Sequence, residues 1–142
     1  MLGPLFTDRS QDEVLVAVHV PERRPGQARG YAKVKFFERP AASVAVSIDV
    51  TDDGTIGAAT VAAGSLTEIP VAVPAAGEAL VGLPASGAPS DSDDALAPAR
   101  EALAELDAVD DLNGSADYKR HLAGILLGRA LRDALLEMPA RA

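Results

Sequence analysis

Hydrophobic and polar residues alternate along four stretches in the first half of the chain, and this period of two predicts β-strands. The first stretch, residues 12–20, carries four valines on one side and ends at Pro21. The others lie at residues 31–37, 44–50 and 56–64. Because each has one strongly apolar side, we expect half-buried strands in a sheet that is covered on one face.

The connection between the last two strands reads Thr51-Asp-Asp-Gly54, which favours a tight hairpin because glycine takes positive φ without penalty. The strand that returns from this turn is rich in small residues. We expect a neighbour to pack closely on it, most naturally the terminal helix; the small residues are Gly57, Ala58, Ala59, Ala62 and Ala63.

Beyond residue 70 the hydrophobic spacing changes from two to three and four, which predicts helices. A short helix is expected over residues 74–80, with Gly82 as a left-handed cap, and a second lies within residues 96–106. A third, longer helix ends the chain. Strands followed by helices predict an α+β fold: an antiparallel sheet of three to four strands packed against a layer of three helices, as a two-layer sandwich.

The long terminal helix is expected to begin at Ser115, whose hydroxyl can cap free backbone N–H groups, and to end before Pro139. At 100° per residue it has two apolar faces, so it must be covered on two sides. Either the sheet and other helices of its own domain cover both, or one side is left for a second domain, and we expect part of each. Gly124 and Gly128 would allow close approach. One face carries Tyr118, Leu122, Ile125 and Leu126, and the other carries Leu127, Ala130, Leu131, Ala134 and Leu135.

The length of 142 residues and a hydrophobic content of 48% fit one domain with a core of its own. We expect this domain to span residues 1–142, with an entry segment at 1–11, the sheet within 13–64 and the helices within 74–138.

A net charge of −8 argues against binding to nucleic acid or to an anionic membrane. Because the chain has no cysteine, it offers no disulfide, thiolate zinc site or iron–sulfur cluster. It shows neither a secretory leader nor an apolar stretch long enough to span a bilayer, so the cytoplasm is the expected compartment.

The sequence carries little chemistry that could act by itself. His19 and His121 lie far apart without a metal-binding spacing, and no metal site or catalytic residue is expected. The acidic run at residues 91–94 lacks the glycine and glutamate of a calcium loop and suits helix capping better. No glycine-rich phosphate loop is present. Lys33 and Lys35 share one strand face, which either is a solvated edge or faces an anion.

Five short motifs occur in an order that resembles one known family. They are D-E-V-L-V-A-V-H-V-P at 12–21, G-Y-A-K-V-K at 30–35, G-S-L followed by P and E-A-L-V-G within 64–82, D-L-N-G-S-A-D-Y-K-R-H-L at 111–122, and R-A-L at 129–131. The chain is thereby similar to the C-terminal domain of the FAD-carrying medium subunit of molybdenum hydroxylases, such as carbon monoxide dehydrogenase and xanthine dehydrogenase. The resemblance covers about residues 5–136.

This resemblance implies a role beside FAD. In such subunits an N-terminal domain wraps the FAD pyrophosphate and the C-terminal domain closes over the flavin. The family positions that contact FAD correspond to Leu15 and Lys33 here. The glycine-rich loops of the N-terminal domain are absent before Met1, so we expect that another domain or subunit supplies most of the FAD site. The chain alone is then neither catalytic nor a tight FAD binder.

Three functions follow from these expectations. The first is a flavin-covering domain in an oxidoreductase that passes electrons from iron–sulfur clusters through FAD to an external acceptor, assembled with iron–sulfur and molybdopterin subunits. The second is a non-catalytic scaffold or assembly module of the same fold, which docks on oxidoreductase subunits without flavin. The third, a small-ligand binder, has only Lys33 and Lys35 in its favour.

Overall fold

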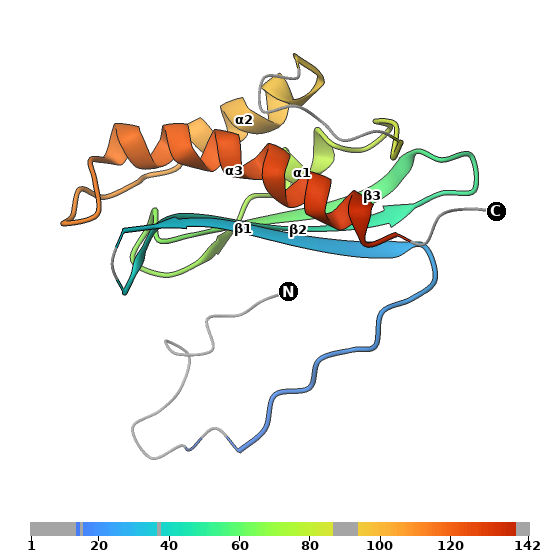
Figure 1. The fold of residues 1–142 in the computed structure, drawn as a ribbon, viewed down its shortest axis with the longest axis horizontal. Helices are drawn as coiled ribbons and strands as arrows, with labels where there is room; N and C mark the ends of the chain where they lie inside the picture. Colours follow the sequence, from blue (N-terminus) through green and yellow to red (C-terminus); the bar gives the residue numbers. More distant parts are fainter. Residues whose placement is uncertain (1–13, 15, 37, 87–93, 139–142) are drawn as a thin grey trace.

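A four-stranded antiparallel sheet with helices on one face makes up the computed structural model, which describes residues 14, 16–36, 38–86 and 94–138 (Figure 1). The strand order is β1-β2-β3-β4. The predicted α+β two-layer architecture is confirmed. The elements are β1 (Gln27–Lys35), β2 (Pro40–Val50), β3 (Ile56–Gly64), β4 (Val71–Ala72), α1 (Pro74–Glu78), the 3-10 turn η1 (Asp94–Leu96), α2 (Ala97–Ala104) and α3 (Ala116–Leu136).

The core lies between the sheet and the helices, and alternate residues of each strand point into it. This confirms the alternation in the three stretches that form β1, β2 and β3. Because apolar side chains on one face of each strand are removed from water, the sheet and helices stabilise each other. The buried strand residues include Ala28, Ala32, Val44, Val46, Ile48, Val61 and Ala63, and the helices contribute Ala76, Leu96, Leu103, Leu122, Leu126, Leu127 and Leu131.

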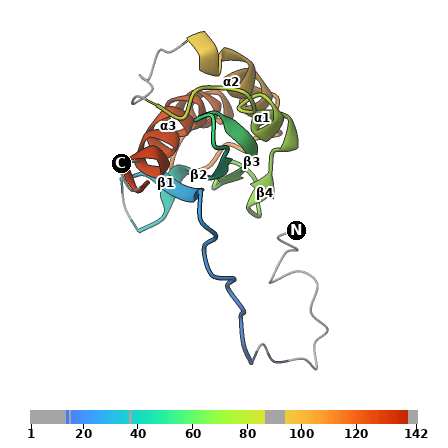
Figure 2. The ribbon, with the colours of Figure 1, turned by 90° about the vertical axis from the view of Figure 1, so that its right-hand side faces the viewer.

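The strand expected over residues 12–20 is wrong for its described residues. Val14 and residues 16–20 belong to no strand, and Figures 1 and 2 show this segment running away from the sheet. Its alternation indicates a preference for a half-buried strand but does not specify a partner. The sheet instead begins at Gln27 and gains β4, whose two residues are too few to show a period.

Four contacts fix the chain just before β1 to the end of the sheet. The backbone N–H of Gln27 donates to the carbonyl of Arg24, 3.0 Å away, and that of Val50 donates to the carbonyl of Gly26 at 2.8 Å. The side chain of Arg24 pairs with Asp49 at 2.9 Å, and that of Arg23 pairs with Glu137 beyond the end of α3 at 2.8 Å. The segment preceding Arg23 therefore leaves the body from a fixed point.

Helix α3 is covered on two sides, as its two apolar faces predicted. It packs on β1 and β2 with one side and on α2 with the other. The small residue that permits the closest approach is in the sheet, because a Cβ added at Gly30 would lie 1.8 Å from the carbonyl oxygen of Ala130. Gly124, by contrast, would meet only Arg100 at an ordinary 3.6 Å.

The expectation that the terminal helix packs closely on residues 56–64 is wrong, because a different helix packs there. The helix that packs there is α1, where a Cβ added at Gly77 would lie 2.6 Å from the carbonyl oxygen of Ala59. The small residues of β3 do serve a close contact. Their pattern indicates a close neighbour but does not specify which helix it is, the short α1 that directly follows the sheet or the long α3 at the end.

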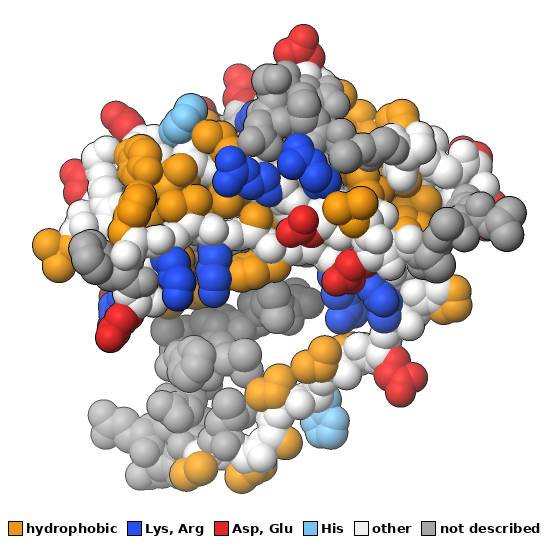
Figure 3. Space-filling model, in the orientation of Figure 1, with side chains coloured by type: hydrophobic (Ala, Val, Ile, Leu, Met, Phe, Trp, Pro, Cys, Tyr) orange, Lys and Arg blue, Asp and Glu red, His pale blue; other side chains and the backbone are white. Residues whose placement is uncertain are grey.

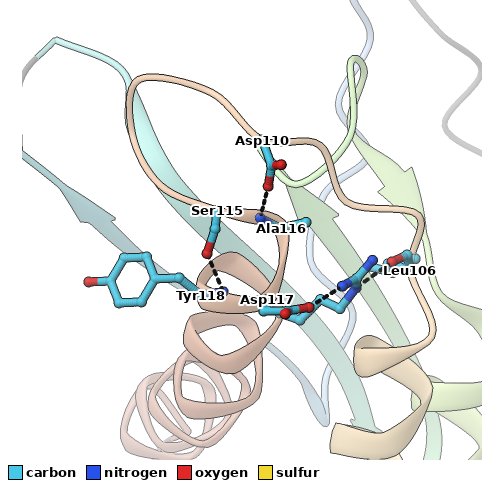
Figure 4. A network of polar contacts seen from close by, with 7 residues as sticks. Leu106, Asp110, Ser115, Ala116, Asp117 and Tyr118 are labelled. Atoms are coloured by element: carbon cyan, nitrogen blue, oxygen red, sulfur yellow. Dashed lines mark hydrogen bonds and ion pairs between the residues drawn. The ribbon is translucent and has the colours of Figure 1, made fainter.

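Capping follows the sequence closely. The Ser115 side chain accepts a hydrogen bond from the Tyr118 N–H at 3.3 Å, and Asp110 accepts one from the Ala116 N–H at 2.6 Å (Figure 4). Gly54 has a φ of +82°, as expected for the hairpin. Gly82 also has a positive φ, of +85°, but the expectation that it caps the short helix is wrong, because α1 ends at Glu78 with Ala79 as its C-cap. Within the described residues, no helix combines the length and the hydrophobicity needed to cross a membrane.

Candidate functional site

The face of the sheet opposite the helices is the candidate site. Figures 1 and 2 show the helices gathered on one face only. Three adjacent cross-strand rows on the open face run from β1 through β2 to β3. The rows are Arg29–Ser47–Thr60, Tyr31–Ala45–Ala62 and Lys33–Ser43–Gly64.

These rows give the open face an uneven profile. The β1 members are long, whereas the β2 and β3 members are small, so the face is a trough with β1 side chains along one edge. An open hollow of about 720 Å³ lies here, and its described lining includes Arg29, Tyr31, Ser47 and Thr60 from the sheet, together with Leu136 of α3. Small side chains let a flat ring system come close to the strands, and the hydroxyls and Arg29 offer hydrogen bonds.

Lys33 is exposed on this face, beside the trough. Its Nζ lies 5.8 Å from the centroid of the Tyr31 ring, at the outer range of a cation–π contact. Within the described residues, no hydrogen bond or ion pair is found for this ammonium group, so it is available to a ligand anion. Lys35 lies two residues further along the same face, after an irregularity in the pairing with β2. Figure 3 shows Lys and Arg side chains, in blue, at several places on the side of the molecule that it draws.

The other candidate residues do not join this site. Leu15 lies outside the described residues, as do Asp91 and Asp93. His19 is exposed on the amino-terminal segment, and His121 is exposed on the side of α3 that faces α2. Among the described residues, no cluster of three His, Cys, Asp or Glu side chains could hold a metal ion.

The sequence reasoning missed an ion pair between a buried lysine of α3 and a partly exposed aspartate in the loop before it. Lys119 is fully buried, and its Nζ lies 2.8 Å from Asp111 and donates to the carbonyl of Val109 at 2.9 Å. The hydrogen bond from the Lys119 ammonium lowers the pKa of the Asp111 carboxyl below its usual value, and the hydrogen bond from the Asn113 N–H lowers it further. A signal was present, because Lys119 shares the three-and-four spacing of the buried residues Leu122 and Ala123.

A second carboxyl with a lowered pKa belongs to the hairpin turn. The pKa of Asp53 lies below its usual value because the hydroxyls of Thr51 and Thr55, and then the Thr55 N–H, donate hydrogen bonds to it. Asp53 is exposed, and its partners all belong to the same turn. The shift therefore reports turn structure and does not mark a catalytic acid.

Solved structures of carbon monoxide dehydrogenases are similar to this chain. Carbon monoxide dehydrogenase from Hydrogenophaga pseudoflava, in a form lacking the Mo-pyranopterin moiety, matches with 28% identity and a TM-score of 0.71 over 84% of this chain and 40% of that chain. The reconstituted CO dehydrogenase from Oligotropha carboxidovorans matches with 25% identity and a TM-score of 0.70 over 82% of this chain and 40% of that chain.

A third structure supports the fold alone. Quinoline 2-oxidoreductase from Pseudomonas putida 86 matches with 23% identity and a TM-score of 0.63 over 79% of this chain and 38% of that chain. No curated protein matches the sequence. The chain thus spans about 40% of the length of the two CO dehydrogenase chains described above.

A family model decides the assignment. The model described as the CO dehydrogenase flavoprotein C-terminal domain matches residues 38–134, which is more than half of the chain and includes β2, β3, α1, α2 and most of α3. This agrees with the resemblance carried by the five sequence motifs. The chain therefore belongs to the CO dehydrogenase flavoprotein C-terminal domain family.

Proposed function

We propose that this chain covers the flavin of an FAD-dependent oxidoreductase of the molybdenum hydroxylase type. The observation that carries the proposal is the open sheet face, a trough with small side chains and an unpaired Lys33 at its edge, in a chain of a flavoprotein family. A helix-covered face would leave no room for such a ligand. Here the helices cover the other face of the sheet, and the end of α3, with Leu136, reaches only one side of the hollow.

The residues of this face fit a flavin ring. Ala45 and Ala62 lie in the middle of the trough and would let a planar group approach, while Ser47, Thr60 and Arg29 can donate hydrogen bonds to its carbonyl oxygens. When bound, FAD would supply electron relay between iron–sulfur clusters and an external acceptor.

Lys33 would set the electrostatics of the ring. An ammonium group near the ring stabilises the negative charge that accumulates when the flavin is reduced, and so raises the reduction potential. The exposure of Lys33 on the open face supports this role. We propose the same role of flavin contact for Leu15, on the resemblance alone.

The phosphate-binding part of the FAD site would come from another domain or subunit. The described helix N-termini give no glycine-rich loop of the kind that cradles a pyrophosphate. We propose that the complete complex also contains the iron–sulfur and molybdopterin subunits that carry the remaining redox centres.

The test is flavin retention. The purified chain is mixed with FAD, alone and together with a candidate flavin-holding polypeptide from the same source, and flavin absorbance is measured after gel filtration. We expect flavin to be retained only with the partner. A stable complex without flavin would support the scaffold function, and tight FAD binding by the chain alone would contradict the division of the site between two parts.

A further inference from the structure

The connection between β3 and β4, residues 65–70, borders the open sheet face at the end next to Lys33, and we call it the β3–β4 loop. It follows Gly64, which shares a cross-strand row with Ser43 and Lys33. A Cβ added at Gly64 would lie 2.7 Å from the Ser43 hydroxyl oxygen and 4.0 Å from the Pro70 Cβ, so the loop returns beside this row. Figure 1 shows the loop, in light green, dipping to the side of the sheet away from the helices.

The β3–β4 loop begins with a strained residue. Ser65 has a φ of +67° and is, among the described residues other than glycine, the one with a positive φ. A side chain disfavours this conformation, so it persists only where the surroundings fix it. Leu66 supplies one restraint, because its side chain is fully buried in the core between sheet and helices. The position of the loop is therefore set partly from the helix side of the sheet.

A second restraint comes from Val109, which lies in the segment between α2 and α3. Its N–H donates to the carbonyl of Leu66 at 2.9 Å. Its own carbonyl accepts a hydrogen bond from the Nζ of Lys119, also at 2.9 Å. Both backbone polar groups of Val109 are thus engaged, one with the β3–β4 loop and the other with α3. A displacement of the Lys119 ammonium would therefore move Val109 and, with it, the carbonyl of Leu66.

The ammonium group of Lys119 has a high desolvation cost in this place. The residue is fully buried, and its charge is paired with Asp111 at 2.8 Å. An apolar residue of similar volume is often as stable or more stable than a buried ion pair, so stability alone does not explain the charge. What the ammonium adds over an apolar side chain is direction, because a charge-assisted hydrogen bond fixes the Val109 carbonyl at one position.

We propose that Lys119 is a positioning residue of the flavin-covering face: through Val109 it holds the β3–β4 loop at the end of the trough next to Lys33. The inference rests on the proposed function and adds to it a determinant of the site that lies on the helix side of the sheet. Because Lys119 is fully buried, it acts on a ligand through the loop and not by contact. A displaced loop would change how closely a flavin ring approaches Lys33 and Ser43.

Two variants of the full chain separate positioning from stability. Lys119→Met keeps the buried stem but removes the hydrogen bond to Val109, whereas Asp111→Asn removes the carboxylate charge and keeps that hydrogen bond. Amide hydrogen exchange at Val109 is measured by NMR relative to the core amide of Val46, which corrects for changes in global stability. We expect this ratio to rise severalfold in Lys119→Met and to change little in Asp111→Asn. A ratio in Lys119→Met equal to that of wild type would overturn the inference.

The flavin itself supplies the second readout. The same two variants are assembled with the flavin-holding polypeptide, and the reduction potential and the iodide quenching of the bound flavin are measured. We expect Lys119→Met to shift the potential or to increase the quenching, and Asp111→Asn to remain close to wild type, because only the first loses the support of the loop. A flavin-containing complex in which Lys119→Met changes neither quantity would overturn the positioning role.

The proposed function can fail separately. A wild-type complex without flavin would contradict the flavin-covering role, while exchange at Val109 in the full chain would still decide whether Lys119 holds the β3–β4 loop. A complex that retains flavin, together with unchanged exchange at Val109 in Lys119→Met, would support the flavin-covering role and overturn the positioning role.

Discussion

A Cβ placed on Gly30 would lie 1.8 Å from the carbonyl oxygen of Ala130 and 2.7 Å from the backbone nitrogen of Ala134. The backbone of β1 thus lies directly against the backbone of α3. Because this contact fixes the height of the long helix above the sheet, it also fixes the position of β1, whose other face carries Arg29, Tyr31 and Lys33.

Gly30→Ala should therefore destabilise the domain by about 3 kcal/mol, since strand or helix backbone must move to relieve the overlap. The control is Gly124→Ala within α3, where the added methyl makes only ordinary contact with Arg100 at 3.6 Å. That change should be neutral or should stabilise by up to about 1 kcal/mol through helix propensity. Urea unfolding of the isolated chain measures both, and similar losses in the two variants would refute the close contact.

The buried Lys119 should contribute mainly through its place in the core. Lys119→Ala removes a fully buried four-carbon stem and should cost about 2–4 kcal/mol. Lys119→Met refills most of that volume without charge and leaves Asp111, whose side chain is 42% exposed, to solvent. We expect Lys119→Met to be clearly more stable than Lys119→Ala in chemical unfolding. Equal loss of stability would mean that the charge matters and the stem does not.

The same ion pair predicts a response to acid. Because the folded-state pKa of Asp111 is lowered, its contribution is fully present above the unfolded-state pKa and is lost as the pH falls through the folded-state value. The stability difference between wild type and Asp111→Asn should therefore be constant near neutral pH and shrink below about pH 4. Unfolding free energies measured from pH 7 to pH 2.5 test this, and a difference independent of pH would contradict it.

Lys33 and Lys35 provide a matched pair for the flavin role. Both are exposed lysines on the same face of β1, but Lys33 lies in the row with Ser43 and Gly64 that adjoins the trough, and Lys35 lies one row further away. In the assembled complex, Lys33→Ala should lower the flavin reduction potential or weaken FAD retention, while Lys35→Ala should change neither. A redox titration monitored by flavin absorbance measures the reduction potential and the amount of bound FAD in each variant. Equal shifts in the two variants would indicate a general charge effect without a specific contact.

Much of the fold could be predicted because alternation and helical spacing are local properties. The strand at residues 56–64 has the predicted bounds, and Ser115 caps α3 as expected. The pairing of elements could not be predicted with the same success. Residues 12–20 have a strand pattern, but no local property states whether this sheet pairs with them, and the choice of α1 over α3 for β3 depends on the arrangement of the whole domain.

The candidate site was predicted in part. Alternation along residues 31–37 separated Lys33 from the core residues Ala32 and Val34, and the structure places Lys33 on the exposed face. Small residues across β2 and β3 become a trough only when register aligns them with β1, which needs the folded sheet. Contact of Lys33 with flavin stays a prediction.

Accessibility of the flavin to a soluble quencher tests the central claim most directly. Iodide quenching of flavin fluorescence is measured in the flavin-holding partner with and without this chain. If the open sheet face covers the ring, adding the chain should reduce the quenching constant severalfold, and Gly30→Ala should reverse part of that effect. An unchanged quenching constant in a complex that has demonstrably formed would contradict the account.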